Sequence, residues 1–148
     1  MSMSGQYGRS FASKLIQDGH YEQAIAEASR QIALEDDNPE HYVDRATACV
    51  QLDRNAEAAA DFVRALALDV EAGLLETDLV DDAYFSALLA VAREEARGSV
   101  EDGCRRLAGY RDTLPAGRHL KDAEDWTRRL RGELKSEFVK ARLDVGDR

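Results

Sequence analysis

The sequence predicts an all-helical protein of one domain, and three observations support this prediction. The 148 residues include only two prolines and ten glycines, the residue types that break helices, but 23 alanines, the best helix former. Hydrophobic residues make up 44% of the chain, which is enough for a packed core. Apolar side chains also recur at steps of three or four along most of the length, as they do on one face of a helix.

The helical pattern repeats. Sliding the sequence by 34 residues brings Ala24-Ile25 onto Ala58-Ala59, which indicates a repeated helical hairpin. In the first copy an apolar run from Phe11 to Leu15 precedes a polar turn at residues 17–20 and a second helix over about 22–34.

The second copy begins with Asn38 and Pro39, which suit a helix N-cap and the first helical turn. Its first helix carries apolar or small residues at helical spacing, and a polar turn follows at residues 53–55. The partner helix is predicted over about 56–68.

A third hairpin does not begin at the next 34-residue step. Residues 70–78 are predicted to be an insertion, followed by helices over about 79–97 and 100–114, with Gly98 as a stop and Ser99 as an N-cap. The apolar residues that follow are separated by steps of three or four and predict one long amphipathic helix that caps the array: Leu120, Ala123, Trp126, Leu130, Leu134, Phe138 and Ala141. A membrane-surface helix is the alternative, but acidic residues interrupt its basic face.

The repeats resemble the tetratricopeptide repeat (TPR) family, whose 34-residue unit reads W-x2-L-G-x2-Y, then A-x3-F, then P. Arg45 stands where leucine is usual, and the first unit departs further from the pattern than the second. The second unit matches best and places these residues in the family's aromatic and packing positions: Tyr42, Ala46, Cys49, Ala58, Phe62 and Ala65.

The resemblance implies a right-handed superhelix of antiparallel helix hairpins with a long C-terminal capping helix. One domain, 1–148, would contain repeat 1 over about 5–38, repeat 2 over about 39–72, the insertion over about 70–78, a divergent repeat 3 over about 79–115 and the capping helix over about 118–143.

The resemblance also implies a partner-binding groove, because TPR proteins hold a peptide or helix against the first helix of each pair. The subgroup that clamps a C-terminal carboxylate has asparagine where this chain has Asp44, so we expect a partner of basic or mixed amphipathic character. Carried over by position, the groove residues are Arg9, Ser13, Ile16, Glu40, Val43, Asp44, Thr47, Val50 and Gln51.

Leu74 and Leu75 form a second candidate surface within the insertion. Either they pack under the neighbouring hairpin, which we favour because exposed apolar pairs are a liability, or they form an apolar spot for a partner.

Composition excludes several function classes. The net charge of −9 is made of −11 in residues 1–100 and +2 in residues 101–148, and it disfavours binding to nucleic acid. No apolar stretch is long enough to cross a bilayer and the start lacks signal-peptide features, so we expect a cytoplasmic protein without membrane insertion. The excess of arginine over lysine, 16 to 4, is typical of GC-rich bacterial genes.

No metal, cofactor or catalytic site is predicted. Cys49 and Cys104 are 55 residues apart without a CxxC motif, and we expect both to be core residues. The three histidines lack metal-ligand spacing, and no GxSxG, HExxH or phosphate-binding loop occurs.

We therefore expect a non-enzymatic adaptor or scaffold that binds another protein. The alternatives are a TPR-type chaperone for a secretion or assembly substrate and, in a different class, a regulatory subunit or enzyme whose site forms on oligomerisation. Homo-oligomerisation stays open.

Overall fold

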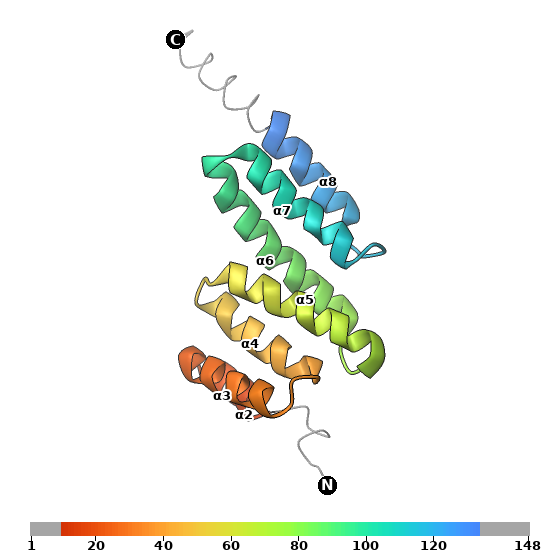
Figure 1. The fold of residues 1–148 in the computed structure, drawn as a ribbon. Coiled ribbons are helices and arrows are strands. Elements are labelled where there is room, and N and C mark those ends of the chain that lie inside the picture. The colour runs from red at the N-terminus through yellow and green to blue at the C-terminus, as the bar shows by residue number, and fades with distance from the viewer. Residues whose placement is uncertain (1–9, 134–148) are drawn as a thin grey trace. The chain divides into compact units, whose positions relative to one another are not determined.

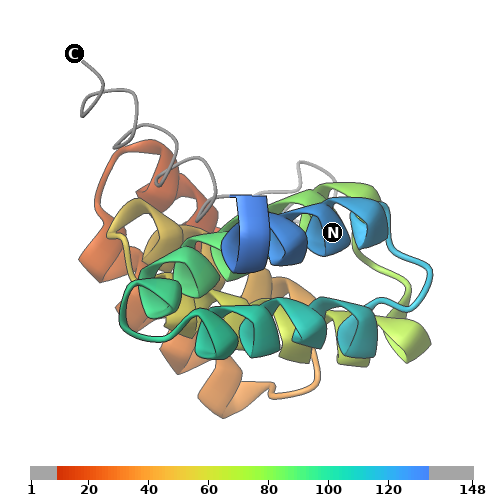
Figure 2. The same ribbon diagram turned by 90° about the horizontal axis from the view of Figure 1, so that it is seen from above.

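Every regular element that the computed structural model describes, over residues 10–133, is a helix (Figures 1 and 2). No helix in this range is long and apolar enough to span a membrane. Seven α-helices and a π-helical turn follow one another: α2 (Phe11–Gln17), α3 (Tyr21–Leu34), α4 (Pro39–Gln51), α5 (Asn55–Ala72), α6 (Thr77–Gly98), α7 (Val100–Thr113), α8 (Leu120–Arg128) and η1 (Arg129–Glu133). The predicted all-α class is confirmed.

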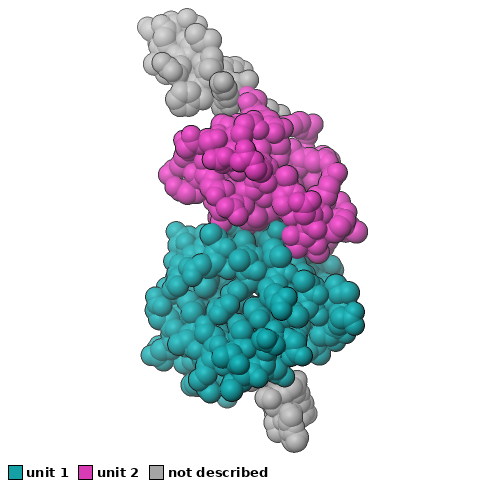
Figure 3. All heavy atoms as spheres, viewed as in Figure 1, with its two compact units in different colours: residues 1–87 teal, residues 88–148 magenta. Residues whose placement is uncertain are grey.

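Two compact units make up the chain, and Figure 3 colours them separately. Unit 1 covers residues 1–87, so its described part holds α2 to α5 and the first half of α6. Unit 2 covers residues 88–148, with the second half of α6, α7, α8 and η1 described. The boundary between them falls inside one helix.

The helix ends in unit 1 follow from their capping residues. The Ser10 hydroxyl accepts a hydrogen bond from the Ser13 backbone N–H at 3.0 Å and caps α2. The Asn38 side chain caps α4 in the same way through the Glu40 N–H, with Pro39 in the first turn as predicted. Gly19 and Gly73 both have positive φ, at 81° and 62°, which lets the chain turn out of α2 and α5.

Small residues form much of the core of unit 1. Helices adjacent in sequence pack together, α2 with α3, α3 with α4 and α4 with α5, which confirms the predicted helical pairing. Ala46 and Ala58 are fully buried, and Phe62 is nearly so. Because an alanine side chain ends at Cβ, it allows two helix backbones to approach closely.

The connection between α5 and α6 is shorter than the predicted insertion over 70–78. Helix α5 continues to Ala72 and α6 begins at Thr77, so only residues 73–76 are non-helical. The physical reason is local: no helix breaker occurs between Leu68 and Ala72, and Gly73 is the first residue that readily adopts the left-handed conformation that ends a helix.

Unit 2 holds the second half of α6 and all of α7, the two helices that the sequence predicted over about 79–97 and 100–114. The Ser99 hydroxyl accepts from the Asp102 N–H and caps α7, as expected. Gly103, Leu107 and Tyr110 are buried on one face of α7. The Tyr110 hydroxyl accepts a hydrogen bond from the His119 N–H at 2.9 Å, which fastens the connection that leads into α8.

The C-terminal helix is only partly as predicted within the described residues. Helix α8 ends at Arg128 and continues as a π-helical turn, and the predicted helix beyond residue 133 lies outside the described residues. Ala123 and Leu130 are buried, in agreement with the apolar stripe. The Cζ atoms of Arg93 and Arg129 lie 4.9 and 4.5 Å from the centroid of the Trp126 ring, within the range of cation–π contacts.

Candidate partner-binding groove

A groove of about 610 Å³ opens within unit 1, between the α4 face and the start of α6. Its volume falls within the range of pockets that enclose ligand groups, about 300–1,000 Å³. The apolar lining residues are Val43, Phe62, Leu74, Leu75, Leu79, Val80 and Ala83. The polar lining residues are Ser10, Glu35, Asn38, Glu40, His41, Asp44, Thr47 and Glu76.

One face of α4 supplies a wall of this groove. Glu40, Val43, Asp44 and Thr47 follow at steps of three, one and three, which places them on the same side of a helix. The Asn38 cap and Pro39 fix where α4 begins.

The loop at residues 73–76 supplies the opposite rim. Asp69, which is buried on α5, accepts hydrogen bonds at Oδ1 from the backbone N–H groups of Leu74 and Leu75, at 2.6 and 3.0 Å. Gly73, which lies between Asp69 and Leu74 in the sequence, is the residue at which α5 ends. One carboxylate oxygen therefore sets the course of the loop and holds both leucines beside the groove.

We expect Asp69→Ala to loosen this loop. The substitution leaves the Leu74 and Leu75 N–H groups without their acceptor, at a cost of about 1–3 kcal/mol. Hydrogen exchange at these two amides should become faster by at least tenfold, whereas Asp69→Asn, which keeps one carbonyl oxygen, should show a smaller increase. Unchanged exchange in Asp69→Ala would show that Asp69 does not hold the loop.

The groove is acidic. Four carboxylates line it, from Glu35, Glu40, Asp44 and Glu76, against one imidazole, from His41. His41 Nε2 lies 2.8 Å from Glu35 Oε1, and this hydrogen bond together with that from Asn38 lowers the pKa of Glu35. Partial burial raises the pKa of Asp44, although the hydrogen bond from Ser10 and the nearby His41 oppose the rise.

The structure brings together only some of the residues predicted for the groove. Glu40, Val43, Asp44 and Thr47 line it. Ser13 is half-buried beside the α2 cap and does not line it, and Ile16 packs on the cluster of Leu15, Ala24 and Ala48. Val50 and Gln51 are on α4 but outside the groove, and Arg9 lies outside the described residues.

The two surfaces predicted separately are one surface. Leu74 and Leu75 line the same groove as Asp44. Leu74 is 54% exposed, so it does not pack under a hairpin as we expected, whereas Leu75 is half-buried. The groove is therefore lined by apolar side chains as well as by carboxylates.

Several groove residues were not predicted from the sequence. Leu79, which is 65% exposed, and Val80 come from the first turn of α6, and Glu35, His41 and Glu76 flank helix ends. One signal was available for Ser10, because it precedes Asp44 by 34 residues, the length of the repeat. Glu76, Leu79 and Val80 line the groove because α6 begins at Thr77, earlier than the predicted insertion over 70–78 allowed.

A second groove, of about 530 Å³, lies between α7 and α8 in unit 2 and is mainly apolar, with Leu107, Leu120 and Ala123 among its lining residues. Its two arginines are paired within the unit, Arg111 with Glu124 and Arg128 with Asp125. The charges at its rim are therefore largely balanced, whereas the lining of the unit 1 groove has more carboxylates than cationic groups.

Comparison of the chain with models of known protein families, with curated proteins and with solved structures finds no match.

Proposed function

We propose that the chain is a non-enzymatic binding module of the tetratricopeptide type, which holds a basic amphipathic helical segment of another protein in the unit 1 groove. The observation that carries this proposal is the composition of the groove, where apolar side chains lie beside four carboxylates and one imidazole. An amphipathic helix would place apolar residues against the leucines and cationic residues near the carboxylates.

Asp44 is central to this recognition. It is the half-buried carboxylate of the groove, so its charge is less screened by water than the charges of Glu35, Glu40 and Glu76, which are exposed. A partner cation beside Asp44 gains more from the interaction than one beside an exposed carboxylate.

The test measures binding of a fluorescent, acetylated and amidated helical peptide of about 16 residues, with leucines on one face and lysines beside them. Fluorescence anisotropy should show saturable binding to the full chain. Asp44→Lys should weaken it by at least tenfold, because the substitution replaces attraction with repulsion.

The matched control is Asp18→Lys, which makes the same charge change at an exposed residue of unit 1 outside the groove. This variant should bind the peptide within about twofold of the unmodified chain at physiological salt. Equal losses in both variants, or no binding to the unmodified chain, would contradict the proposal.

Binding should weaken as the pH falls. The bound cation favours the ionised form of Asp44, and burial raises the pKa of this carboxyl, so the negative charge is lost at a higher pH than for an ordinary aspartate. His41, Glu35, Glu40 and Glu76 are the other titratable residues that line the groove. Anisotropy titrations between about pH 7.5 and 4.5 should show this loss, with a flatter profile for Asp44→Asn. A profile that is the same for both proteins would show that Asp44 does not contribute.

A further inference from the structure

One segment of this chain has the chemistry that the unit 1 groove is proposed to bind. Residues 134–143 lie outside the described residues, and their sequence carries Leu134, Phe138 and Ala141 at steps of four and three. In a helix these side chains would share one face, with Lys135 and Arg142 along one edge of it. The segment has three cationic residues and one acidic residue, a net charge of +2. It is therefore both basic and amphipathic.

The groove and the segment are opposite in charge. Over residues 10–87, unit 1 contains 17 aspartates and glutamates against 5 lysines and arginines. Within the groove, Glu40 and Asp44 lie one helical turn apart on α4. Leu74 and Leu79 line the same groove and are more than half exposed, so apolar surface is left uncovered there. The cations and the apolar face of the segment thus each have a counterpart in the groove.

The lengths of the two surfaces also agree. Glu40 and Thr47 mark the ends of the α4 wall and are seven residues apart, which is about 10 Å along a helix. Leu134 and Ala141 are likewise seven residues apart in the sequence. One helical segment of this length is enough to contact the whole α4 wall.

The position of the segment in the chain favours a second copy as its source. The apolar residues just before it, Ala123 and Leu130, are buried within unit 2. Leu134 follows η1 directly, so no linker residues separate the segment from unit 2. In the same chain the segment is tied to the end of η1, whereas the segment of a second copy can approach the groove freely.

We propose that residues 134–143 of a second copy of the chain bind in the unit 1 groove, so that the chain associates with itself. This inference rests on the proposed function, because it names the segment that the groove holds. The cations of the segment lie near Glu40 and Asp44, and its apolar face covers Leu74 and Leu79.

The first test measures, by fluorescence anisotropy, how a labelled, acetylated and amidated peptide of residues 134–143 binds the full chain. Binding should be saturable. Asp44→Lys should weaken it by at least tenfold, and the control Asp18→Lys should change it by at most about twofold. A second peptide has glutamate in place of Lys135 and Arg142. It should bind Asp44→Lys more tightly than the unmodified chain, because the two charges are exchanged.

The second test measures self-association of the full chain by sedimentation equilibrium. The average mass should rise above that of one chain as the concentration passes the Kd of the peptide. Lys135→Glu/Arg142→Glu should need at least about tenfold more protein for the same rise. The control Arg105→Glu/Lys121→Glu makes the same charge change at two exposed residues of unit 2 outside both grooves, and it should associate as the unmodified chain does.

A chain that stays monomeric at about ten times the Kd of the peptide would overturn the inference, because a second copy would not supply the segment. Undiminished binding of the peptide to Asp44→Lys would also overturn it, since the peptide would then bind outside the groove. If the peptide of residues 134–143 fails to bind but the leucine–lysine peptide binds, this inference is wrong and the proposed function stands. If neither peptide binds, both are wrong.

Discussion

Gly103→Ala should lower the free energy of unfolding by about 2 kcal/mol, although alanine is normally the better helix residue. A Cβ at position 103 would lie 2.6 Å from the Ala92 carbonyl oxygen and 2.8 Å from the Ala96 Cβ. Both atoms belong to the second half of α6, and the first is backbone, so the contact cannot be relieved by rotating a side chain. The expected overpacking cost of about 3 kcal/mol exceeds the gain in helix propensity of about 1 kcal/mol.

Gly109→Ala is the matched control, because Gly109 lies on the same helix and a Cβ there would have nothing within 4 Å. This variant should gain about 0.5–1 kcal/mol from helix propensity alone. Thermal melts of the two variants should therefore move in opposite directions, by about 2–4 °C per kcal/mol for a chain of this length. If both melting temperatures shift in the same direction, α6 and α7 are less closely packed at Gly103 than they are in the structure.

The close approach at Gly103 illustrates what the sequence could predict. Gly103 and Ala58 are both small residues that are buried on their helices, α7 and α5. Apolar periodicity fixes the inward face of a helix, so the burial of Phe62, Leu107 and Tyr110 was also predictable. These features depend on the spacing of residues within one helix, and this spacing can be read directly from the sequence.

The groove was harder to predict because it depends on where helices end. Gly73 and the Asp69 carboxylate together bring Leu74 and Leu75 beside α4. Predicting this required recognising that a buried aspartate accepts two backbone hydrogen bonds five and six residues later, and periodicity does not encode such a contact. The α4 wall was predictable, since Glu40, Val43, Asp44 and Thr47 lie on one helix face.

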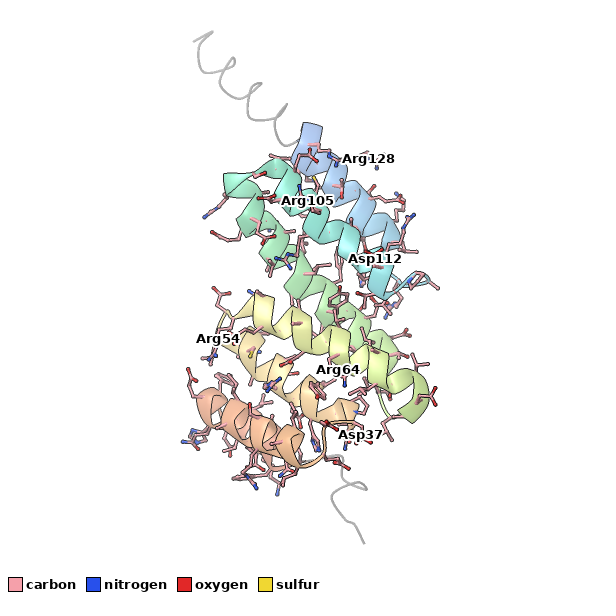
Figure 4. All side chains as sticks on the ribbon, viewed as in Figure 1. Asp37, Arg54, Arg64, Arg105, Asp112 and Arg128 are labelled. Atoms are coloured by element: carbon pink, nitrogen blue, oxygen red, sulfur yellow. The ribbon has the colours of Figure 1, made fainter. Side chains whose placement is uncertain are left out.

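The second large effect concerns Arg45 on α4. Its guanidinium donates to both oxygens of Asp61 on α5 and, at 3.1 Å, to the Ser29 hydroxyl on α3. Its Cζ also lies 5.9 Å from the centroid of the Tyr42 ring, and the Cζ of Arg64 lies 6.0 Å from the same centroid. Arg64, which extends from α5, is labelled in Figure 4. One side chain of α4 thus connects three helices of unit 1.

Asp61→Ala should lower the free energy of unfolding by about 2 kcal/mol. The side chains of Arg45 and Asp61 are 28% and 13% exposed. The cost should therefore lie between the 0–1 kcal/mol of an exposed pair and the 3–5 kcal/mol of breaking a fully buried one. Urea unfolding measures this loss. The control is Arg54→Ala, which breaks the exposed pair with Glu57 and should cost at most about 0.5 kcal/mol.

The double variant Arg45→Leu/Asp61→Ala should be more stable than Asp61→Ala alone. Removing one partner leaves a partly buried charge without its counter-ion, whereas removing both places an apolar residue at position 45 and leaves no such charge. The coupling energy from the double-mutant cycle should be about 1–2 kcal/mol in favour of the intact pair. Strictly additive losses would mean that the two residues stabilise unit 1 independently, through packing alone. A coupling of the expected size would show that the ion pair stabilises the packing of α4 against α5. The pair would then also help to hold the α4 face that lines the groove.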